Sequence, residues 1–300
     1  MRDLTAPSSS EEGVGGGVSV AQAIRAAAEQ LAATSDTARL DAELLAAHLL
    51  GLSRSEMLLR AMRDEAPPGL PALVERRMAH EPVAYITGRQ EFYGLPFRVT
   101  PAVLIPRGDS EVLVERALAV MPGAGRVLDC GTGSGALLLA VLAMNQVAEG
   151  LGIDRSETAL ALARDNAASL GLAPRTRMEL ADWHQPGWTR DLGRFDLILA
   201  NPPYVEDEAE LAPSVRDHEP ASALFAGPEG LDDYRVLVPQ LPALLSPGGV
   251  ALVEIGHRQA EAVGAIARQA GFETVLHKDL AGRPRVLELK IPLGNATPSA

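Results

Sequence analysis

A run of glycines near the middle of the chain has the composition of a ligand-binding turn. Gly131, Gly133 and Gly135 follow a short apolar segment, and the apolar residues 136–144 that come next predict a helix. Glycines at such a junction let the backbone turn sharply and approach a ligand closely. Asp154 ends the next predicted strand, where a carboxylate accepts hydrogen bonds from both ribose hydroxyls of an adenosine ligand. The spacing therefore predicts an adenosine-containing cofactor contacted by Gly131, Thr132, Gly133, Ser134, Gly135 and Asp154.

The charge beside this loop discriminates between two such cofactors. Gly131-x-Gly133-x-x-Ala136 also satisfies a relaxed dinucleotide-binding fingerprint. Asp129, however, precedes the loop, and a carboxylate there repels a pyrophosphate but suits the positive sulfonium and amino groups of S-adenosyl-L-methionine. We therefore predict S-adenosyl-L-methionine as the cofactor. Cys130 has no histidine near it in sequence, which indicates a buried apolar side chain rather than a nucleophile.

A second motif, Asn201-Pro202-Pro203-Tyr204, follows the buried strand predicted over residues 195–200. Ligands bind at the carboxyl ends of the strands in open α/β sheets. The two prolines lack backbone N–H groups, which leaves the local carbonyls as acceptors. The Asn201 oxygen and one carbonyl can then hold both hydrogens of a planar –NH₂ group, and Tyr204 supplies a flat face for stacking on that group.

This arrangement suits methyl transfer to an amide or aryl amine nitrogen. Such a nitrogen is a poor nucleophile because its lone pair is delocalised. Two acceptors on the –NH₂ group favour a pyramidal nitrogen whose lone pair points at the methyl group, and positioning alone contributes about 7–11 kcal/mol. We expect no metal to take part. The expected catalytic residues are Asn201, Pro202 and Tyr204, and the expected substrate-binding residues are Asn201, Pro202, Pro203 and Tyr204.

These motifs must be positioned by a sheet whose strands alternate with helices. Apolar helical segments are centred near residues 138, 163, 237 and 264. Strands that alternate with helices imply a mostly parallel sheet covered on both faces. The predicted fold class is therefore α/β, with strands over residues 126–129, 150–153, 176–180, 195–200, 250–254, 273–276 and 285–289.

The residues before the sheet predict a small bundle of about four helices. Gly51 marks the end of the second helix, and Ser53 and Glu56 have the spacing of a capping box at the start of the third. Three prolines between residues 67 and 71 open the fourth helix. Apolar residues recur at helical spacing in the first two helices: Val20, Ile24, Ala27 and Leu31, then Leu40, Leu44, Leu45 and Leu49.

Composition completes the expected domain organisation. Residues 1–17 and the tail 293–300 predict disordered ends, because such segments cannot bury enough apolar surface to become ordered. Residues 18–90 form the helical domain, and residues 91–106 alternate apolar and polar side chains around a Gly-Leu-Pro turn, which predicts a hairpin linker. Residues 107–292 form the cofactor-binding domain.

Charge and cysteine content exclude several classes of protein. The 300 residues carry 27 Lys and Arg against 39 Asp and Glu, a net charge of −12, which argues against sequence-nonspecific nucleic-acid binding. A single cysteine excludes an intramolecular disulfide framework and suits a reducing compartment. The first residues lack the apolar stretch of a signal peptide. We therefore expect a cytoplasmic protein.

Over residues 20–290 the chain resembles the glutamine methyltransferases of peptide chain release factors, the HemK/PrmC type. The Asn-Pro-Pro-Tyr motif alone is shared with adenine amino-methyltransferases, whereas the helical N-terminal domain and the Ile105-Pro106-Arg107 segment are more specific. The segments that carry the resemblance are 81–88, 92–97, 103–107, 128–135, Asp182-Trp183, Asn201–Tyr204, His218-Glu219-Pro220, Gly230-Leu231 and Glu254-Ile255-Gly256.

The resemblance implies a Rossmann-like class I methyltransferase domain after a helical substrate-recognition domain. It implies cofactor contacts at residues 131–135, Asp154, Trp183 and Asn201, and a substrate glutamine from the Gly-Gly-Gln motif of release factors. We expect a monomer that contacts neither membrane nor nucleic acid. The chain departs from the family pattern at Gly108 and Ser110, where Pro and Thr are usual, and at Pro284, where an acid is usual.

The sequence leaves two interpretations open for each of three side chains. Trp183 lies beside the adenine or packs in the core. Arg107 positions the carboxylate of the cofactor's methionyl group or pairs with Asp109 or Glu111 at the surface. Glu254 lines the site or makes structural hydrogen bonds.

Two functions remain to be compared, a protein-glutamine methyltransferase and an adenine methyltransferase acting on DNA or RNA. Residues 201–235, which begin with the catalytic motif, hold nine acids against two arginines. An acidic rim repels phosphates but attracts a basic protein loop. This charge favours modification of a protein glutamine.

Overall fold

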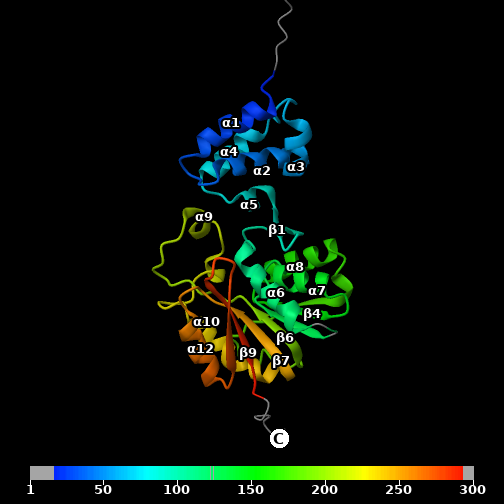
Figure 1. The fold of residues 1–300 in the computed structure, drawn as a ribbon, viewed down its shortest axis with the longest axis vertical. Coiled ribbons are helices and arrows are strands. Elements are labelled where there is room, and N and C mark those ends of the chain that lie inside the picture. Colours follow the sequence, from blue (N-terminus) through cyan, green and yellow to red (C-terminus); the bar gives the residue numbers. More distant parts are fainter. Residues whose placement is uncertain (1–16, 122, 124, 293–300) are drawn as a thin grey trace, which may run out of the picture. The chain divides into compact units, whose positions relative to one another are not determined.

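The structure of the protein is a computed structural model that describes residues 17–121, 123 and 125–292 (Figure 1). The chain separates into two compact units, one ending at Thr87 and the other beginning at Gly88. The tails expected over 1–17 and 293–300 lie outside the described residues, apart from Gly17. None of the helices in the described ranges combines the length and apolar character needed to cross a membrane.

The N-terminal unit is a bundle of short helices with its own apolar core. Ser19 caps the first helix through a capping box, and Ser53 and Glu56 form the predicted capping box of the third. Gly51 adopts the left-handed conformation (φ 66°) that ends the second helix. The helices are α1 (Val20–Leu31), α2 (Ala38–Leu50), α3 (Arg54–Glu56) with its π-helical continuation Met57–Ala61, α4 (Leu70–Met78) and α5 (Val83–Thr87).

One face of this bundle differs from the sequence expectation. Leu40 and Leu49, predicted to face the core, are exposed, whereas Asp41 and Glu43 are buried. The two acids are buried because they are paired: Asp41 accepts from the Arg77 guanidinium at 2.7 Å, and Glu43 is paired with two arginines. Buried charges are tolerated when they are paired and hydrogen-bonded. Leu45, from the same apolar pattern, is fully buried, so apolar spacing alone identified only part of the buried face of α2.

The second unit is built on a seven-stranded sheet. Its strand order is β5-β4-β3-β6-β7-β9-β8, and only β9 runs antiparallel to its neighbours. All seven predicted strands are confirmed, with β7 beginning five residues earlier than expected. The strands are β3 (Arg126–Cys130), β4 (Glu149–Asp154), β5 (Thr176–Leu180), β6 (Phe195–Ala200), β7 (Leu245–Glu254), β8 (Glu273–Lys278) and β9 (Pro284–Lys290).

Helices cover both faces of this sheet, as predicted (Figure 1). Alternate residues of one strand enter opposite cores: Leu197 and Leu199 pack with α6, α7 and α8, while Ile198 and Ala200 pack with α10, α11 and α12. This alternation follows from the two-residue period of a strand. The helices are α6 (Glu111–Val120), α7 (Ala136–Met144), α8 (Glu157–Ser169), α9 (Pro213–Arg216), α10 (Asp232–Leu237), α11 (Leu241–Leu244) and α12 (Ala260–Gln269).

A short hairpin precedes the sheet in the second unit. It consists of β1 (Arg89–Phe92) and β2 (Leu95–Arg98), which pair antiparallel around a Tyr93-Gly94 turn. Phe92 and Phe97 anchor the hairpin in the core formed with α6–α8. Four 3₁₀ turns complete the unit, at Gly108–Ser110, Ala173–Arg175, Ala221–Ala223 and Val238–Gln240.

Candidate active site

A cavity of about 270 Å³ lies at the carboxyl ends of the parallel strands. The strand order reverses between β3 and β6, and such a switch point is where open α/β sheets bind their ligands. The whole cavity belongs to the second unit. Its wall includes Gly131, Thr132, Gly133 and Ser134 after β3, Asp154 and Arg155 after β4, Asp182 and Trp183 after β5, and Asn201 and Pro203 after β6.

The loop after β3 places backbone rather than side chains against the cavity. Gly131, Gly133 and Gly135 all have positive φ, at 76°, 55° and 83°. A Cβ on Gly131 would lie 3.1 Å from the Trp183 ring. The N–H groups of Gly131 and Thr132 both donate to the Ile153 carbonyl at 2.9 Å, which ties the loop to β4. Glycine is required here by conformation and by space.

Asp154 connects this loop to the end of β4. One carboxylate oxygen accepts from the Gly133 N–H at 2.9 Å, and the other accepts from the Ser156 N–H at 2.9 Å. Each oxygen of a carboxylate has room for about two donors. The half-buried side chain on the cavity wall therefore keeps acceptor capacity for hydroxyl groups of a ligand.

Asp129 lies beneath the loop and is not part of the cavity wall. Its carboxylate accepts from the Thr132 hydroxyl at 2.7 Å, while its second oxygen, Oδ1, is buried without a partner. Burial raises the pKa of Asp129 to about 7, and the nearby Asp154 adds to this effect. A cation bound above the loop would lower this pKa. The Asp129 carboxylate, which was expected beside the cofactor, is thus a buried group whose pKa is close to neutral pH.

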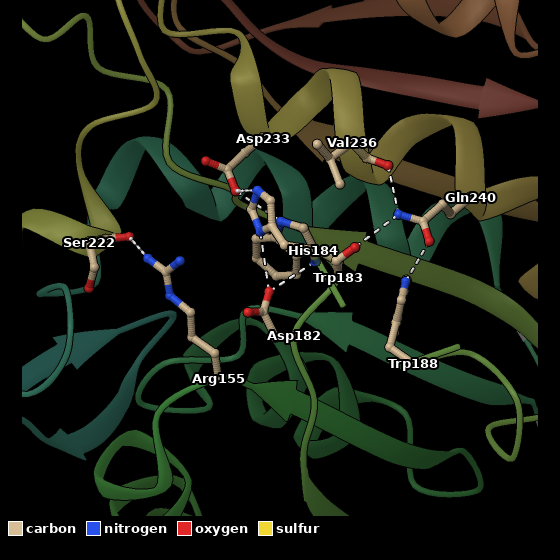
Figure 2. A network of polar contacts seen from close by, with 9 residues as sticks. All are labelled: Arg155, Asp182, Trp183, His184, Trp188, Ser222, Asp233, Val236 and Gln240. Atoms are coloured by element: carbon tan, nitrogen blue, oxygen red, sulfur yellow. Dashed lines mark hydrogen bonds and ion pairs between the residues drawn. The ribbon is translucent and has the colours of Figure 1, made fainter. Parts of the chain in front are cut away.

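Trp183 packs in the core on the α10–α12 face and also lines the cavity, so contact with the adenine stays a prediction. The indole N–H donates to Asp233 at 2.9 Å, and the Trp183 carbonyl accepts from Gln240 at 3.1 Å (Figure 2). Both contacts come from α10 and the 3₁₀ turn that follows it. Trp183 is therefore a fixed part of the wall.

The Asn201–Tyr204 segment leaves β6 with its first residue facing the cavity. Asn201 and Pro203 line the wall, and the Asn201 side chain makes no hydrogen bond with any residue that the structure describes. Pro202 is buried, and Tyr204 lies outside the wall with its hydroxyl 3.4 Å from the Glu254 carboxylate. Burial raises the pKa of Tyr204 to about 12, so it remains protonated. Asn201 is thus available to a ligand, while Tyr204 is engaged with the protein.

Arg107 pairs with a residue that the sequence did not suggest. Its guanidinium contacts the buried Glu219 carboxylate, and both residues belong to the family-like segments. The two expected partners are occupied elsewhere, because Asp109 pairs with Arg285 at 2.8 Å and Glu111 accepts from the Tyr93 N–H. The predicted pairing with Asp109 or Glu111 is therefore wrong. Arg107 still lines the cavity.

Glu254 and Cys130 are both buried, and their surroundings decide between the roles considered for them. Glu254 does not line the cavity: its carboxylate accepts a hydrogen bond from the Tyr204 hydroxyl, and burial raises its pKa to about 7. Its structural interpretation is the one that the geometry supports. Cys130 is fully buried in the core, and burial raises its thiol pKa well above the usual value, which leaves it unreactive.

Two side chains that the sequence did not indicate hold segments of the cavity wall in place. Asn166 on α8 is buried; it donates to the Ser134 carbonyl at 2.8 Å and exchanges two hydrogen bonds with the Arg98 backbone. It thereby joins the glycine loop to β2. Arg155 donates to the Ser222 carbonyl at 2.8 Å on the cavity wall (Figure 2). A lone Asn or Arg in a helix or loop carries no distinguishing local signal, so neither was identifiable by spacing.

Known proteins resemble this chain along nearly its whole length. A family model described as the PrmC N-terminal domain matches residues 22–88, and one described as a methyltransferase domain matches residues 123–273. The release factor glutamine methyltransferase of Caulobacter vibrioides is 43% identical over 86% of this chain and 91% of that protein. Its counterpart from Cereibacter sphaeroides is 42% identical over 91% of this chain and 98% of that protein. A solved methyltransferase from Pyrococcus furiosus has a TM-score of 0.48 and 17% identity, covering 74% of this chain and 98% of the other.

Proposed function

The chain belongs to the release factor glutamine methyltransferase family, and from this we propose its reaction in detail. It transfers a methyl group from S-adenosyl-L-methionine to the side-chain amide nitrogen of the glutamine in the Gly-Gly-Gln motif of peptide chain release factors. The observation that carries this proposal is the unpartnered side chain of Asn201, which faces the cavity at the switch point of the sheet.

The residues around the cavity fit S-adenosyl-L-methionine. Asp154 has spare acceptor capacity for ribose hydroxyls, the glycine loop offers close backbone approach, and Trp183 supplies an apolar wall for the adenine. The buried, unpartnered oxygen of Asp129 suits a positive charge nearby. When bound, this cofactor supplies an electrophilic methyl group on a sulfonium.

The chain's own contribution is to prepare the glutamine nitrogen. The Asn201 oxygen and a prolyl carbonyl accept hydrogen bonds from the two hydrogens of the –NH₂ group, and this geometry favours the pyramidal nitrogen of the transition state over the planar ground state. Interactions that strengthen in the transition state are the ones that raise kcat. Pro202 and Pro203 suit this task because they have no N–H to compete for those acceptors.

The charge around the site favours a basic partner. In residues 201–235, both arginines are already paired with acids: Arg216 with Asp217, and Arg235 with Glu229 and Asp232. Four further acids are exposed on the stretch that follows the catalytic segment: Glu206, Asp207, Glu208 and Glu210. This rim repels nucleic-acid phosphates and attracts the basic surface that a ribosome-binding release factor needs.

Three features of the working enzyme complete the proposal. We propose that the N-terminal helical domain recognises the release factor, that the chain acts as a monomer without binding nucleic acid, and that it works in the cytoplasm. The net charge of −12 supports the lack of nucleic-acid binding, and the single cysteine supports the cytoplasm.

A labelling experiment tests the proposed reaction. The purified chain is incubated with methyl-labelled S-adenosylmethionine and one of three acceptors: a release factor, the same factor with Gln replaced in its Gly-Gly-Gln motif, or DNA. We expect label on the intact release factor alone. Label on DNA would favour the adenine methyltransferase, and label on the Gln-substituted factor would place the modification elsewhere.

A further inference from the structure

Two family-like motifs outside the cavity wall, Gly230-Leu231 and Glu254-Ile255-Gly256, surround the side-chain amide of Gln259. The Gln259 oxygen accepts from the Gly256 N–H at 3.0 Å. Its nitrogen donates to the Gly230 carbonyl at 3.1 Å and to the Tyr204 carbonyl at 3.0 Å. The amide of Gln259 therefore connects three chain segments that are far apart in sequence.

The absence of a Cβ at Gly230 and Gly256 leaves room for this amide. A Cβ on Gly256 would lie 2.7 Å from the Gln259 oxygen. A Cβ on Gly230, whose φ is 64°, would lie 2.8 Å from the Gln259 nitrogen and 2.3 Å from the Tyr204 carbonyl oxygen. Real Cβ contacts do not become this short, so both positions require glycine for the amide to reach Tyr204.

Of the three residues that follow Asn201 in the catalytic segment, only Tyr204 can be anchored through both backbone groups, since Pro202 and Pro203 have no N–H. Its N–H donates to the Leu224 carbonyl at 3.1 Å, its hydroxyl lies 3.4 Å from Glu254, and its carbonyl accepts from Gln259. The Tyr204 carbonyl and the Val205 N–H belong to one peptide plane. This plane is held on one side by Gln259 and on the other by the bond from the Val205 N–H to the Leu224 carbonyl at 2.8 Å.

We infer that Gln259 is a positioning residue for methyl transfer: by holding the Tyr204 carbonyl, it fixes the segment so that Asn201 faces the substrate nitrogen. This inference rests on the proposed function for its kinetic readout. A misplacement of reacting groups by about 1 Å costs on the order of 10²-fold in rate. Loss of the Gln259 amide therefore acts on kcat rather than on cofactor binding.

Gln240 offers a matched comparison on the other side of the site. It also donates to two backbone carbonyls, those of Trp183 at 3.1 Å and Val236 at 2.8 Å, and its oxygen accepts from the Trp188 indole (Figure 2). Gln240 does not line the cavity itself but holds Trp183, the wall residue assigned to the adenine, whereas Gln259 contacts the substrate-binding segment. The two glutamines make similar hydrogen bonds to backbone carbonyls, but we expect Gln259 to affect kcat and Gln240 to affect cofactor binding.

The first test compares Gln259→Ala with Gln240→Ala in the full-length protein. For Gln259→Ala we expect kcat for the release factor to fall by about 10²-fold, with the dissociation constant of S-adenosylmethionine within about twofold of wild type. For Gln240→Ala we expect the larger change in that dissociation constant. An unchanged kcat in Gln259→Ala, or a loss confined to cofactor affinity, would overturn the inference.

The conservative variant Gln259→Glu adds a pH readout. Its carboxylate would face the carbonyl oxygens of Tyr204 and Gly230, whereas its protonated form can donate a hydrogen bond to one of them. We expect the kcat of Gln259→Glu, divided by that of wild type at the same pH, to rise as the pH falls from 8 to 6. A ratio that does not change with pH would contradict a role for the donated bond.

Hydrogen exchange tests the same inference without any methyl transfer. The amides of Tyr204 and Val205, which both donate to the Leu224 carbonyl, should exchange several-fold faster in Gln259→Ala than in wild type. They should stay protected in Gln240→Ala. If wild type left the release factor unmodified, the proposed function would fail, and this exchange pattern would still decide the role of Gln259. Equal protection in both variants would rule out that role.

Discussion

Asn201 lies on the cavity wall, and its side-chain amide makes no hydrogen bond within the described part of the chain. Its contribution should appear mainly in the transition state, because its oxygen binds the substrate –NH₂ group most strongly as the nitrogen becomes pyramidal. We predict that Asn201→Ala lowers kcat by about 10²–10³-fold, the range for losing one preorganised polar contact. The dissociation constant of the cofactor, measured by calorimetry, should change much less.

Asn201→Asp serves as the control for this prediction. It keeps the acceptor oxygen and adds a negative charge near the sulfonium. If positioning by an acceptor dominates, Asn201→Asp should retain more activity than Asn201→Ala. Normal turnover by both variants at saturating release factor would contradict the proposed mechanism.

Asp154 is the residue on which the cofactor assignment depends most directly. Its carboxylate already holds the Gly133 and Ser156 amides, and its remaining acceptor capacity faces the cavity. We predict that Asp154→Ala weakens binding of S-adenosylmethionine by about 1.5–3 kcal/mol, the range for hydrogen bonds to a charged group. Isothermal calorimetry on the full chain measures this. An unchanged dissociation constant would exclude Asp154 from the site.

Glu254 gives the protein a pH-dependent stability. Burial raises its pKa in the folded state to about 7 from the usual 4.5. The folded state therefore holds the proton more tightly than the unfolded chain does. The stability that this group contributes is complete below about pH 4.5 and is lost as the pH rises through 7, and the shift corresponds to about 3 kcal/mol.

The variant Glu254→Gln isolates this effect, because a glutamine is neutral at every pH. We predict that the stability of Glu254→Gln relative to wild type is about 2–3 kcal/mol greater at pH 8 than at pH 5, because only the wild type loses stability as the pH rises. Urea unfolding of both proteins at the two pH values gives the comparison, and the titration of all other groups cancels in the difference. A difference that is the same at both pH values would show that Glu254 ionises normally in the fold.

At the scale of the element, the turn from β3 into α7 depends on glycine for two separable reasons. Gly135 has a φ of 83°, and a Cβ there would lie 2.9 Å from a Leu139 methyl group. Gly171, in the turn after α8, has a similar φ of 71° but open space around it. Comparing alanine at these two positions separates backbone strain from overpacking.

We predict that Gly171→Ala costs about 1–2 kcal/mol of stability, which is the strain of a left-handed alanine. Gly135→Ala should cost an additional 1–3 kcal/mol or so, because the extra methyl group must displace Leu139. Urea titrations of the two variants measure both values. Equal losses would show that Leu139 moves aside freely.

At the scale of the whole molecule, the two units have separate cores and different tasks. The cavity and its predicted residues lie entirely in the second unit, whereas the N-terminal bundle contributes no residue to the cavity wall. Deletion of residues 1–87 should therefore leave cofactor binding intact. It should raise KM for an intact release factor, because the bundle is the proposed recognition domain.

A short Gly-Gly-Gln peptide provides the control for this deletion, since it is too small to need a second contact surface. Its methylation should be nearly as fast with the truncated chain as with the full one. Equal loss of activity on the peptide and on the whole factor would instead assign the bundle a role in folding.

The sequence by itself determined the order of elements and the place of the site. The seven strands were predicted from local sequence, and chemistry-bearing residues directly follow three of the predicted strands: the glycine loop, Asp154 and Asn201. The cofactor contact of Trp183 was implied by the family resemblance instead. The strand and loop patterns are local signals, because a strand's period, a glycine turn and a proline pair are written in neighbouring residues. Parallel strands bring their carboxyl ends to one edge, so local signals sufficed to predict a common site.

Only the tertiary structure decided which side chains hold that site in place. Arg107 pairs with Glu219, which lies 112 residues away in the sequence, and Gln259 donates to the carbonyl of Tyr204, which lies 55 residues away. The buried face of α2 was likewise set by Arg77, which lies 36 residues from Asp41 and allows that acid to be buried. Such partners leave no pattern in neighbouring residues. They depend on where the folded chain provides a counter-charge or a hydrogen-bond partner that offsets the cost of burying a polar group.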